Sequence, residues 1–147
     1  MEKTQNFYNL AKEYCCFIAE KEITVSDVPT LIELLMNLYI MAMNLPELEP
    51  ETNDSSSSDS DRLLIHFDKQ VPTLYWEVFN PYVQEEPVCG DLFDDLSDIA
   101  LDVKNGMKEY EAGRIGNAVF EWKNGLNSHW GHHIVDALRA LHTIRSR

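Results

Sequence analysis

The sequence has few of the residues that mark disulfide-rich or nucleic-acid-binding proteins. Its three cysteines, Cys15, Cys16 and Cys89, are odd in number and form no C-x-x-C pair, so we expect neither a disulfide framework nor a cysteine zinc site. We expect small core thiols in a reducing compartment. Only 12 Lys and Arg accompany 25 Asp and Glu, and this balance argues against binding to nucleic acid or to anionic membranes, which need cationic surface.

Long apolar runs are also lacking. The most apolar stretch, residues 31–45, is shorter than the roughly 20 residues of a membrane span and is interrupted by Glu33, Asn37 and Asn44. Residues 1–12 have no uninterrupted apolar segment of the kind found in secretory signals. We therefore expect a cytoplasmic monomer or homodimer that is kept soluble by its net charge of −13, with a basic protein as the favoured partner.

The residues that are present suffice for one helical domain. The 147 residues are 44% hydrophobic, which is enough apolar surface to form a single core. Apolar side chains recur at steps of three and four over residues 4–22 and 91–112, and this spacing predicts amphipathic helices. Gly113 supplies a left-handed end for the second of these helices.

Residues 27–44 predict a helix that is apolar nearly all round. Ser26 or Asp27 can cap its start, and Pro29 is tolerated in its first turn. Such a helix is expected to be buried on most sides, either at the centre of the bundle, which we favour, or in a dimer interface.

The middle of the chain is less regular. Residues 46–62 are acidic and rich in serine, and they predict a flexible loop inserted within one fold. Residues 63–67 fit a short strand or a helical turn, and residues 72–79 suggest a short helix. From residue 114 to the end, two apolar stripes change phase near residues 124–128, which predicts two helices or one kinked helix.

A histidine cluster near the C-terminus offers one candidate metal site. His129, His132 and His133 are followed by Asp136, and spacings of three and four place such side chains on one helical face. The structural alternative, which we favour at this stage, is that His133 borders the core, His129 caps or kinks the junction, and His132 pairs with Asp136.

An acidic run offers a second candidate site. The helix predicted over residues 91–112 crowds one side with aspartates, which face water unless a cation meets them: Asp91, Asp94, Asp95, Asp98 and Asp102. Asp94, Asp95 and Asp98 are spaced to hold magnesium. The stretch Asp94-Asp95-Leu96-Ser97-Asp98 resembles one helix of the all-α nucleoside triphosphate pyrophosphohydrolases, but the E-x-x-E that this family carries on a preceding helix is missing.

No further motif for catalysis or cofactor binding is recognisable. G-x-S-x-G, G-x-G-x-x-G and the Walker A pattern are all missing, so no cofactor is expected.

A more extensive resemblance covers about half of the chain. It is carried by segments 75–79 (YWEVF), the aspartate-rich helix, 111–113 (EAG), 129–133 (HWGHH) and 137–141 (ALRAL). These look like a family of small bacterial helical proteins that is classed as a domain of unknown function. The resemblance implies an all-helical fold and a bacterial cytoplasmic setting, without an activity.

Together these observations predict one all-α domain, a bundle of five or six helices anchored by Trp76, Trp122 and Trp130. The function we favour at this stage is a non-enzymatic interaction module that uses acidic faces. The alternative is a magnesium-dependent nucleotide hydrolase in which Asp94, Asp95 and Asp98 hold the metal and the histidines assist.

Overall fold

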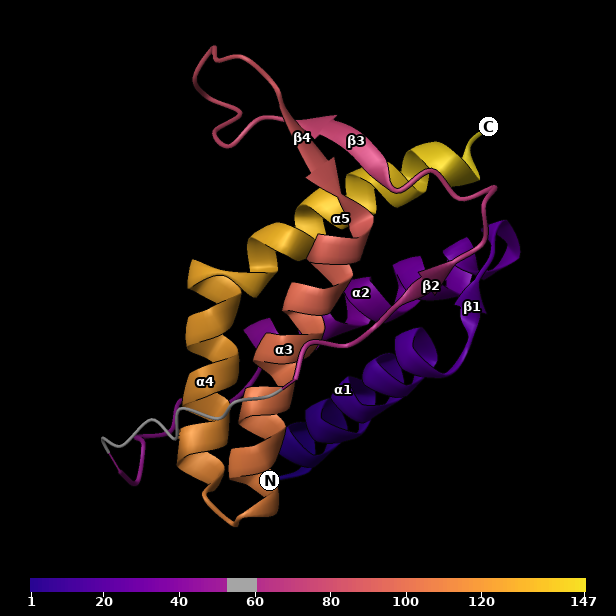
Figure 1. Ribbon diagram of the computed structural model, residues 1–147. Helices are drawn as coiled ribbons and strands as arrows, with labels where there is room; N and C mark the ends of the chain where they lie inside the picture. Colours follow the sequence, from indigo (N-terminus) through magenta and orange to yellow (C-terminus); the bar gives the residue numbers. More distant parts are fainter. Residues whose placement is uncertain (53–60) are drawn as a thin grey trace.

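Five helices form one all-α domain, as the sequence predicts (Figure 1). The computed structural model describes residues 1–52 and 61–147. The helices are α1 (Glu2–Glu20), α2 (Val28–Met43), α3 (Leu92–Glu111), α4 (Ile115–Ser128) and α5 (Trp130–Arg145), with a short 3-10 turn, Val25–Asp27, before α2. Two small pairs of strands complete the fold: β1 (Glu22–Ile23) beside β2 (His66–Phe67), and β3 (Leu74–Glu77) beside β4 (Val88–Asp91).

The core lies among the five helices. Both α2 and α3 pack against α1, α4 and α5. Trp122 and Trp130 are fully buried, and the ring of Phe7 lies 4.7 Å from that of Trp122. The indole N–H groups of both tryptophans donate to backbone oxygens, of Val103 and Trp122 respectively, so these anchors also satisfy their polar atoms. The predicted central position of residues 31–43 is therefore shared with α3.

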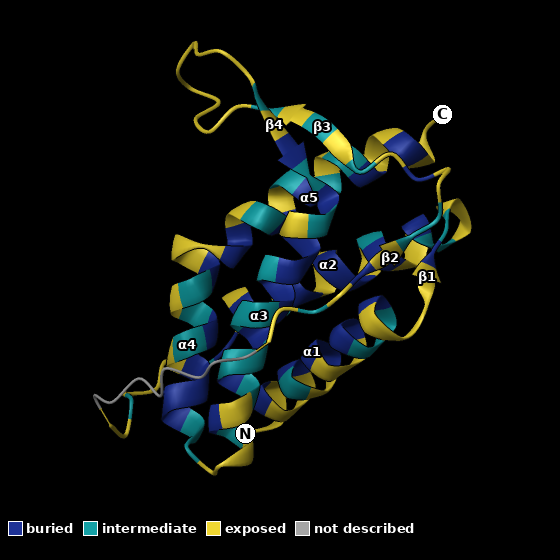
Figure 2. Cartoon of the chain, in the orientation of Figure 1, coloured by how far each residue is buried: buried dark blue, intermediate teal, exposed yellow. Residues whose placement is uncertain are grey.

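One face of α2 is open to solvent in the single chain, so this helix is not buried on most sides within the bundle, and the alternative that this face lies in a dimer interface stays a prediction. Val28, Leu31, Leu35 and Leu38 are fully buried, whereas Met36, Ile40 and Met43 are 48%, 53% and 61% exposed. Figure 2 shows both buried and exposed segments along α2. Residues 25–43 are long and apolar enough to cross a membrane by composition alone. Their buried face, however, belongs to the helical core.

The strands correct two further expectations. The helix expected over residues 72–79 is instead β3, which pairs antiparallel with β4, and Trp76 is 74% exposed rather than a core anchor. Aromatic residues fit a strand as well as a helical turn, and the neighbours Tyr75 and Trp76 followed by Phe79 do not separate the two periods within eight residues. The alternatives left open for residues 63–67 resolve to the strand His66–Phe67, which pairs parallel with β1.

The loop and the cysteines have mixed outcomes. Residues 46–52 and 61–62 of the expected acidic loop carry no helix or strand, and residues 53–60 lie outside the described part of the chain. The flexibility of this loop stays a prediction.

Cys15 is buried as expected, but Cys16 is only partly buried and Cys89 is exposed.

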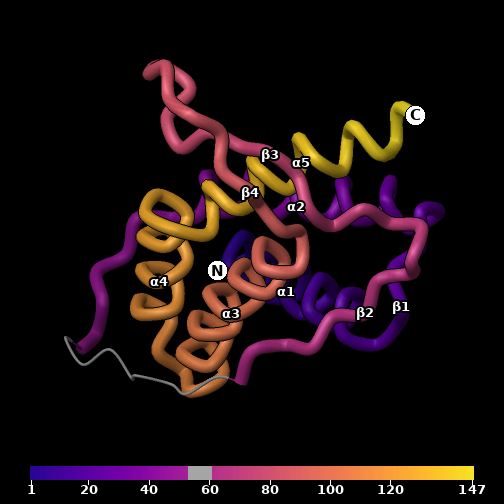
Figure 3. The backbone as a smooth tube through the Cα atoms, turned by 45° about the horizontal axis from the view of Figure 1, so that its top comes forward, coloured from indigo at the N-terminus to yellow at the C-terminus, as the bar shows by residue number. Residues whose placement is uncertain are grey.

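Two tight joints connect the last three helices. Gly113, with φ of 81°, ends α3 in the left-handed conformation that the sequence predicts. The break expected near residues 124–128 occurs at His129, whose φ of −147° and ψ of −79° are neither helical nor extended and which precedes α5 without a side-chain capping hydrogen bond. Because α4 and α5 cross at this joint, the first part of α5 lies beside α3 (Figure 3).

A candidate metal centre between α3 and α5

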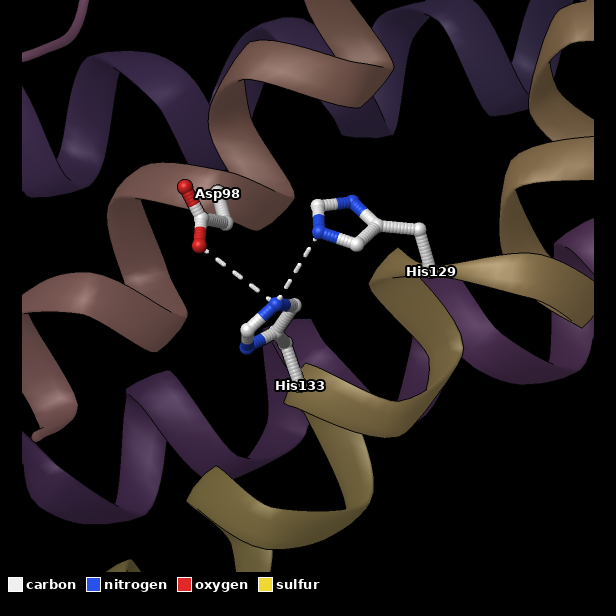
Figure 4. A group of neighbouring side chains, drawn as sticks. All are labelled: Asp98, His129 and His133. Atoms are coloured by element: carbon white, nitrogen blue, oxygen red, sulfur yellow. Dashed lines mark hydrogen bonds and ion pairs between the residues drawn. The ribbon is translucent and has the colours of Figure 1, made fainter. Parts of the chain in front are cut away.

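The packing of α3 against α5 brings the two candidate clusters of the sequence together. On α3, Asp95, Asp98 and Asp102 follow at steps of three and four, so they share one face of the helix. On α5, His129 and His133 are four residues apart and share the facing side. Figure 4 shows the two imidazole rings and the Asp98 carboxylate converging from these helices. These three aspartates therefore do not face water but meet His133, Arg62 and His129, which is the exception that the sequence analysis left open.

Three ligand atoms surround one point in this cluster. The Nε2 atom of His133 lies 3.3 Å from the Nε2 atom of His129 and 3.4 Å from an Oδ atom of Asp98. Each of the three residues offers one atom, and all three atoms lie within 4.8 Å of one another. His129 is half exposed, with 52% of its side chain accessible, whereas Asp98 and His133 are mostly covered, so the point is open to solvent on one side.

Two carboxylates hold the far nitrogen of each imidazole. Nδ1 of His129 lies 2.6 Å from Asp102, and Nδ1 of His133 lies 2.8 Å from Asp95. Because a carboxylate only accepts, each Nδ1 must carry the hydrogen and donate it. In the neutral rings this tautomer leaves the Nε2 lone pairs free to face the common point.

The Asp98 carboxylate is held as well, by Arg62 from the segment that precedes β2. One Oδ atom of Asp98 lies 3.2 Å from the Arg62 guanidinium, and the other Oδ atom faces His133. Asp94 accepts from the same guanidinium at 3.1 Å. Arg62 therefore supplies positive charge beside an otherwise acidic site.

Asp95 connects the cluster to strand β3. Its carboxylate is only 5% exposed and accepts from the Tyr75 hydroxyl through one oxygen and from His133 through the other. Burial and the hydrogen bond to Asp95 raise the pKa of Tyr75 well above its ordinary value, so this hydroxyl stays a donor. The hydrogen bond to Asp95 also raises the pKa of His133, although burial opposes the shift.

A pair of carboxyl groups lies next along the same strand. Glu77 of β3 forms a hydrogen bond with Asp136 of α5, and two carboxyl groups can do so only when they share a proton. Burial and the nearby Glu77 charge raise the pKa of Asp136 from 3.8 to about 7. The Tyr75 hydroxyl lies 3.2 Å from Glu77, which links this pair to Asp95.

The structure sorts the seven candidate residues into two groups. It brings together Asp95, Asp98, His129 and His133. Asp94 is exposed and touches Arg62, His132 is exposed and lines a groove beneath β3, and Asp136 pairs with Glu77. The three aspartates expected to hold magnesium therefore do not converge on one point.

Sequence reasoning did not single out Asp102, Tyr75, Glu77 and Arg62 as site residues. Asp102 carried a usable signal, since it continues the spacing of Asp95 and Asp98 by one further turn. Tyr75 and Glu77 share one face of strand β3, a signal that was lost because residues 72–79 were expected to be helical, and Arg62 comes from irregular backbone, where spacing along the chain gives no direction.

Comparisons with known proteins support the fold and add no activity. The model of a family described as a domain of unknown function, DUF5063, matches residues 1–147. The crystal structure of protein BF1032 from Bacteroides fragilis is similar with a TM-score of 0.70 and 19% identity, and the match covers 100% of this chain and 97% of that one. At this identity the likeness shows the fold alone. No curated protein matches the chain.

Proposed function

The chain belongs to the family described as a domain of unknown function, DUF5063, and from that premise we propose that it binds a divalent transition metal ion through His129, His133 and Asp98. The observation that carries the proposal is the convergence of two imidazole Nε2 atoms and one carboxylate oxygen on a point between α3 and α5. The proposal departs from the magnesium site that the aspartate spacing suggests.

The spacing of the ligand atoms fits a tetrahedral ion. Two ligands about 2.0–2.1 Å from a zinc ion and separated by the tetrahedral angle lie roughly 3.3 Å apart. The two measured separations from His133, 3.3 Å and 3.4 Å, match this value. The third separation, between His129 and Asp98, lies within 4.8 Å, so an ion at the common point would draw these two ligands toward one another.

The outer partners support the same conclusion. Metal-bound histidines regularly donate their second ring nitrogen to a carboxylate, which fixes the ring and increases its basicity. Both histidines here have such a partner, and Arg62 holds the non-facing oxygen of Asp98. A chance meeting of surface side chains would not give all three ligands a partner behind them.

The donor set favours zinc or a neighbouring transition metal. Imidazole suits zinc, copper, iron and nickel, whereas magnesium and calcium prefer oxygen ligands only. Three protein ligands leave at least one coordination position for water, as in catalytic zinc sites.

Isothermal titration of the untagged protein with zinc, manganese and magnesium tests the proposal. We expect one zinc per chain and no comparable heat from magnesium. His129→Ala and Asp98→Asn should each weaken zinc binding by about 100-fold or more, because each removes one of three ligands. His132→Ala is the matched control, since this exposed histidine lies one helical turn away and should leave the affinity unchanged.

Cobalt substitution gives an independent readout of the site. A tetrahedral site with two imidazoles should give intense visible absorption, which His129→Ala should lose and His132→Ala should keep. Equal losses in both variants, or a wild-type protein that binds magnesium more tightly than zinc, would refute the assignment.

Metal-dependent hydrolysis is a second candidate function, favoured by the open coordination position. A zinc-bound water has a pKa near 7 and is a nucleophile at neutral pH. A screen for release of phosphate or pyrophosphate from nucleotides in the presence of zinc or manganese tests it, with His129→Ala as the inactive control. Turnover that survives in this variant would exclude the site as its origin.

The interaction module expected from the acidic composition, with a basic partner and a cytoplasmic setting, remains a proposal. The aspartates of α3 support it less than their spacing suggests, because Asp95, Asp98 and Asp102 are engaged by His133, Arg62 and His129.

A further inference from the structure

Strands β3 and β4 and the segment between them present an unusually apolar surface. The segment between the strands projects away from the helices (Figures 1 and 3), and most of it is exposed (Figure 2). Phe79 and Tyr82 are 79% and 96% exposed there, and Val83 is 53% exposed. Monomeric proteins rarely leave contiguous apolar patches of more than a few hundred Å² uncovered.

Strand β3 places apolar side chains on its exposed side and polar side chains on its buried side. Its outward side carries Leu74 and Trp76, which are 66% and 74% exposed, and continues to Val78. Its inward side carries Tyr75 and Glu77, which form the hydrogen bonds to Asp95 and Asp136. A strand with one free side normally turns its polar side chains outward, so the outward side of β3 has the composition of a covered surface.

A groove runs beside this strand. It is lined by Trp76 and Phe79 from the strand and its loop, by Val135 and Arg139 from α5, and by Tyr39 from α2. Phe79 and Tyr82 are both largely exposed and also line this groove, so the same aromatic side chains form its wall and its exposed edge. Arg139 and Asp136 place both signs of charge in the same groove.

The exposed area approaches what a stable dimer needs. Aromatic side chains each bury roughly 150–250 Å² when covered, so Trp76, Phe79 and Tyr82 together offer about 500 Å². Stable interfaces cover roughly 800 Å² on each partner. Leu74, Val78, Val83 and Val135 lie on or beside the same strand and groove and can supply the remainder.

From these observations we infer that this surface docks a second copy of the chain in a two-fold symmetric dimer. In such an interface each residue i contacts residue j while j contacts i, so one patch must contain both the knob and the hole. The hairpin aromatics of one copy insert into the β3–α5 groove of the other, and Arg139 of each copy meets an acidic group of its partner. The inference is independent of the proposed metal site.

Sedimentation velocity of the full chain tests this inference. Between about 1 and 100 µM, a range that brackets ordinary reversible dimers, we expect the mass to rise from 17.0 kDa toward twice that value. Trp76→Ser combined with Phe79→Ser should weaken the dimer at least tenfold. Both side chains are largely exposed, so the variant should keep the thermal midpoint of the wild type.

The control and a second readout keep the test specific. Phe120→Ser removes another exposed aromatic side chain, on α4 outside this surface, and should leave the dimer intact. Trp122 and Trp130 are buried, so protection of tryptophan fluorescence from acrylamide with rising concentration reports Trp76. A wild type that is monomeric throughout, a dimer that survives the double substitution, or a monomer that instead binds phosphatidylcholine vesicles would each overturn the inference.

Discussion

The imidazole nitrogens of His129 and His133 show how single residues prepare this site. Each ring donates from Nδ1 to a carboxylate, and so each presents Nε2 to the same point. A proton on the wrong nitrogen would close the site to a metal, because a protonated Nε2 has no lone pair to give. Asp95 and Asp102 therefore act as positioning residues, and neither contributes an atom to the common point.

Replacement of Asp102 tests this positioning role. Asp102→Asn keeps an acceptor of similar size but removes the charge that fixes and polarises the His129 ring. We expect zinc affinity to fall about 10- to 100-fold while the stoichiometry stays at one, which is the usual cost of losing an outer partner. Competitive titration against a chromogenic chelator measures the change. Glu111→Gln, an exposed site on the same helix, should have no effect, and an unchanged affinity in Asp102→Asn would contradict the role.

The carboxyl pair of Glu77 and Asp136 predicts a pH dependence of stability. The pKa of Asp136 rises from 3.8 to about 7 on folding, so between these pH values the folded chain holds a proton that the unfolded chain has lost. Stability is then fully present below about pH 4 and declines as pH rises toward about 7. The groups that face Asp136 are Glu77 from β3, Asp95 from α3 and His133 from α5.

Asp136→Asn should remove this dependence, because the amide stays neutral and keeps a donor for Glu77. Above pH 7 we expect the variant to be more stable than the wild type by about 1–2 kcal/mol, a figure reduced for partial exposure. Below about pH 4 the two should be equal. Urea unfolding at pH 4 and pH 8 measures the difference, with Glu33→Gln on the exposed face of α2 as the control. A parallel pH profile for wild type and Asp136→Asn would show that the pair carries no such proton.

At the scale of elements, the contact between α3 and α4 depends on a missing side chain. A Cβ atom on Gly106 would lie 2.2 Å from the indole nitrogen of Trp122, which donates to Val103. The glycine thus allows the fully buried Trp122 ring to lie directly on the α3 backbone.

Gly106→Ala should destabilise the fold although alanine is the better helix former. Alanine gains about 1 kcal/mol of helix propensity, but the clash with Trp122 costs typically 1–3 kcal/mol or more once the ring is displaced. We expect a net loss of about 1–2 kcal/mol in the free energy of unfolding, accompanied by a change in Trp122 fluorescence. Lys108→Ala, an exposed site two residues further on, serves as the propensity control. A Gly106→Ala protein as stable as Lys108→Ala would show that the ring relocates freely.

Helix periodicity predicted the long elements well and the short ones poorly. The stripes over residues 4–22 and 91–112 correspond closely to α1 and α3, because twenty residues contain several turns of the same pattern. Residues 72–79 were assigned the wrong period, since Trp76 and Phe79 are exposed and Tyr75 alone of the three aromatic side chains packs against the core. The exposure of one face of α2 was not predicted either. Apolar content indicates that a surface is covered, but the cover can come from a second chain rather than from the same chain.

At the scale of the whole molecule, the sequence predicted the class of fold and several residues of the candidate site, but not how those residues meet. The resemblance to a helical family and the apolar stripes both predicted an all-α domain, which is confirmed. One half of the site was visible in the spacing of Asp95 and Asp98 and the other in that of His129 and His133, whereas Asp102 was not singled out. That the halves meet depends on how α4 and α5 cross, and this is set by the packing of Trp122 and Trp130 rather than by any local pattern.

The proposed ion would connect α3 to α5, so metal binding should stabilise the entire domain. The helices already pack through buried residues without it, so the domain should fold metal-free and gain stability only by mass action. At a zinc concentration about 100 times the dissociation constant the gain is roughly 2.7 kcal/mol, which corresponds to an increase in melting temperature of about 5–10 °C for a domain of this size. Scanning calorimetry with and without EDTA should show this shift for wild type and for His132→Ala, and should show none for His129→Ala. An equal shift in all three proteins would mean that zinc binds elsewhere, and a domain that unfolds in EDTA would mean that the core is weaker than its buried tryptophans indicate.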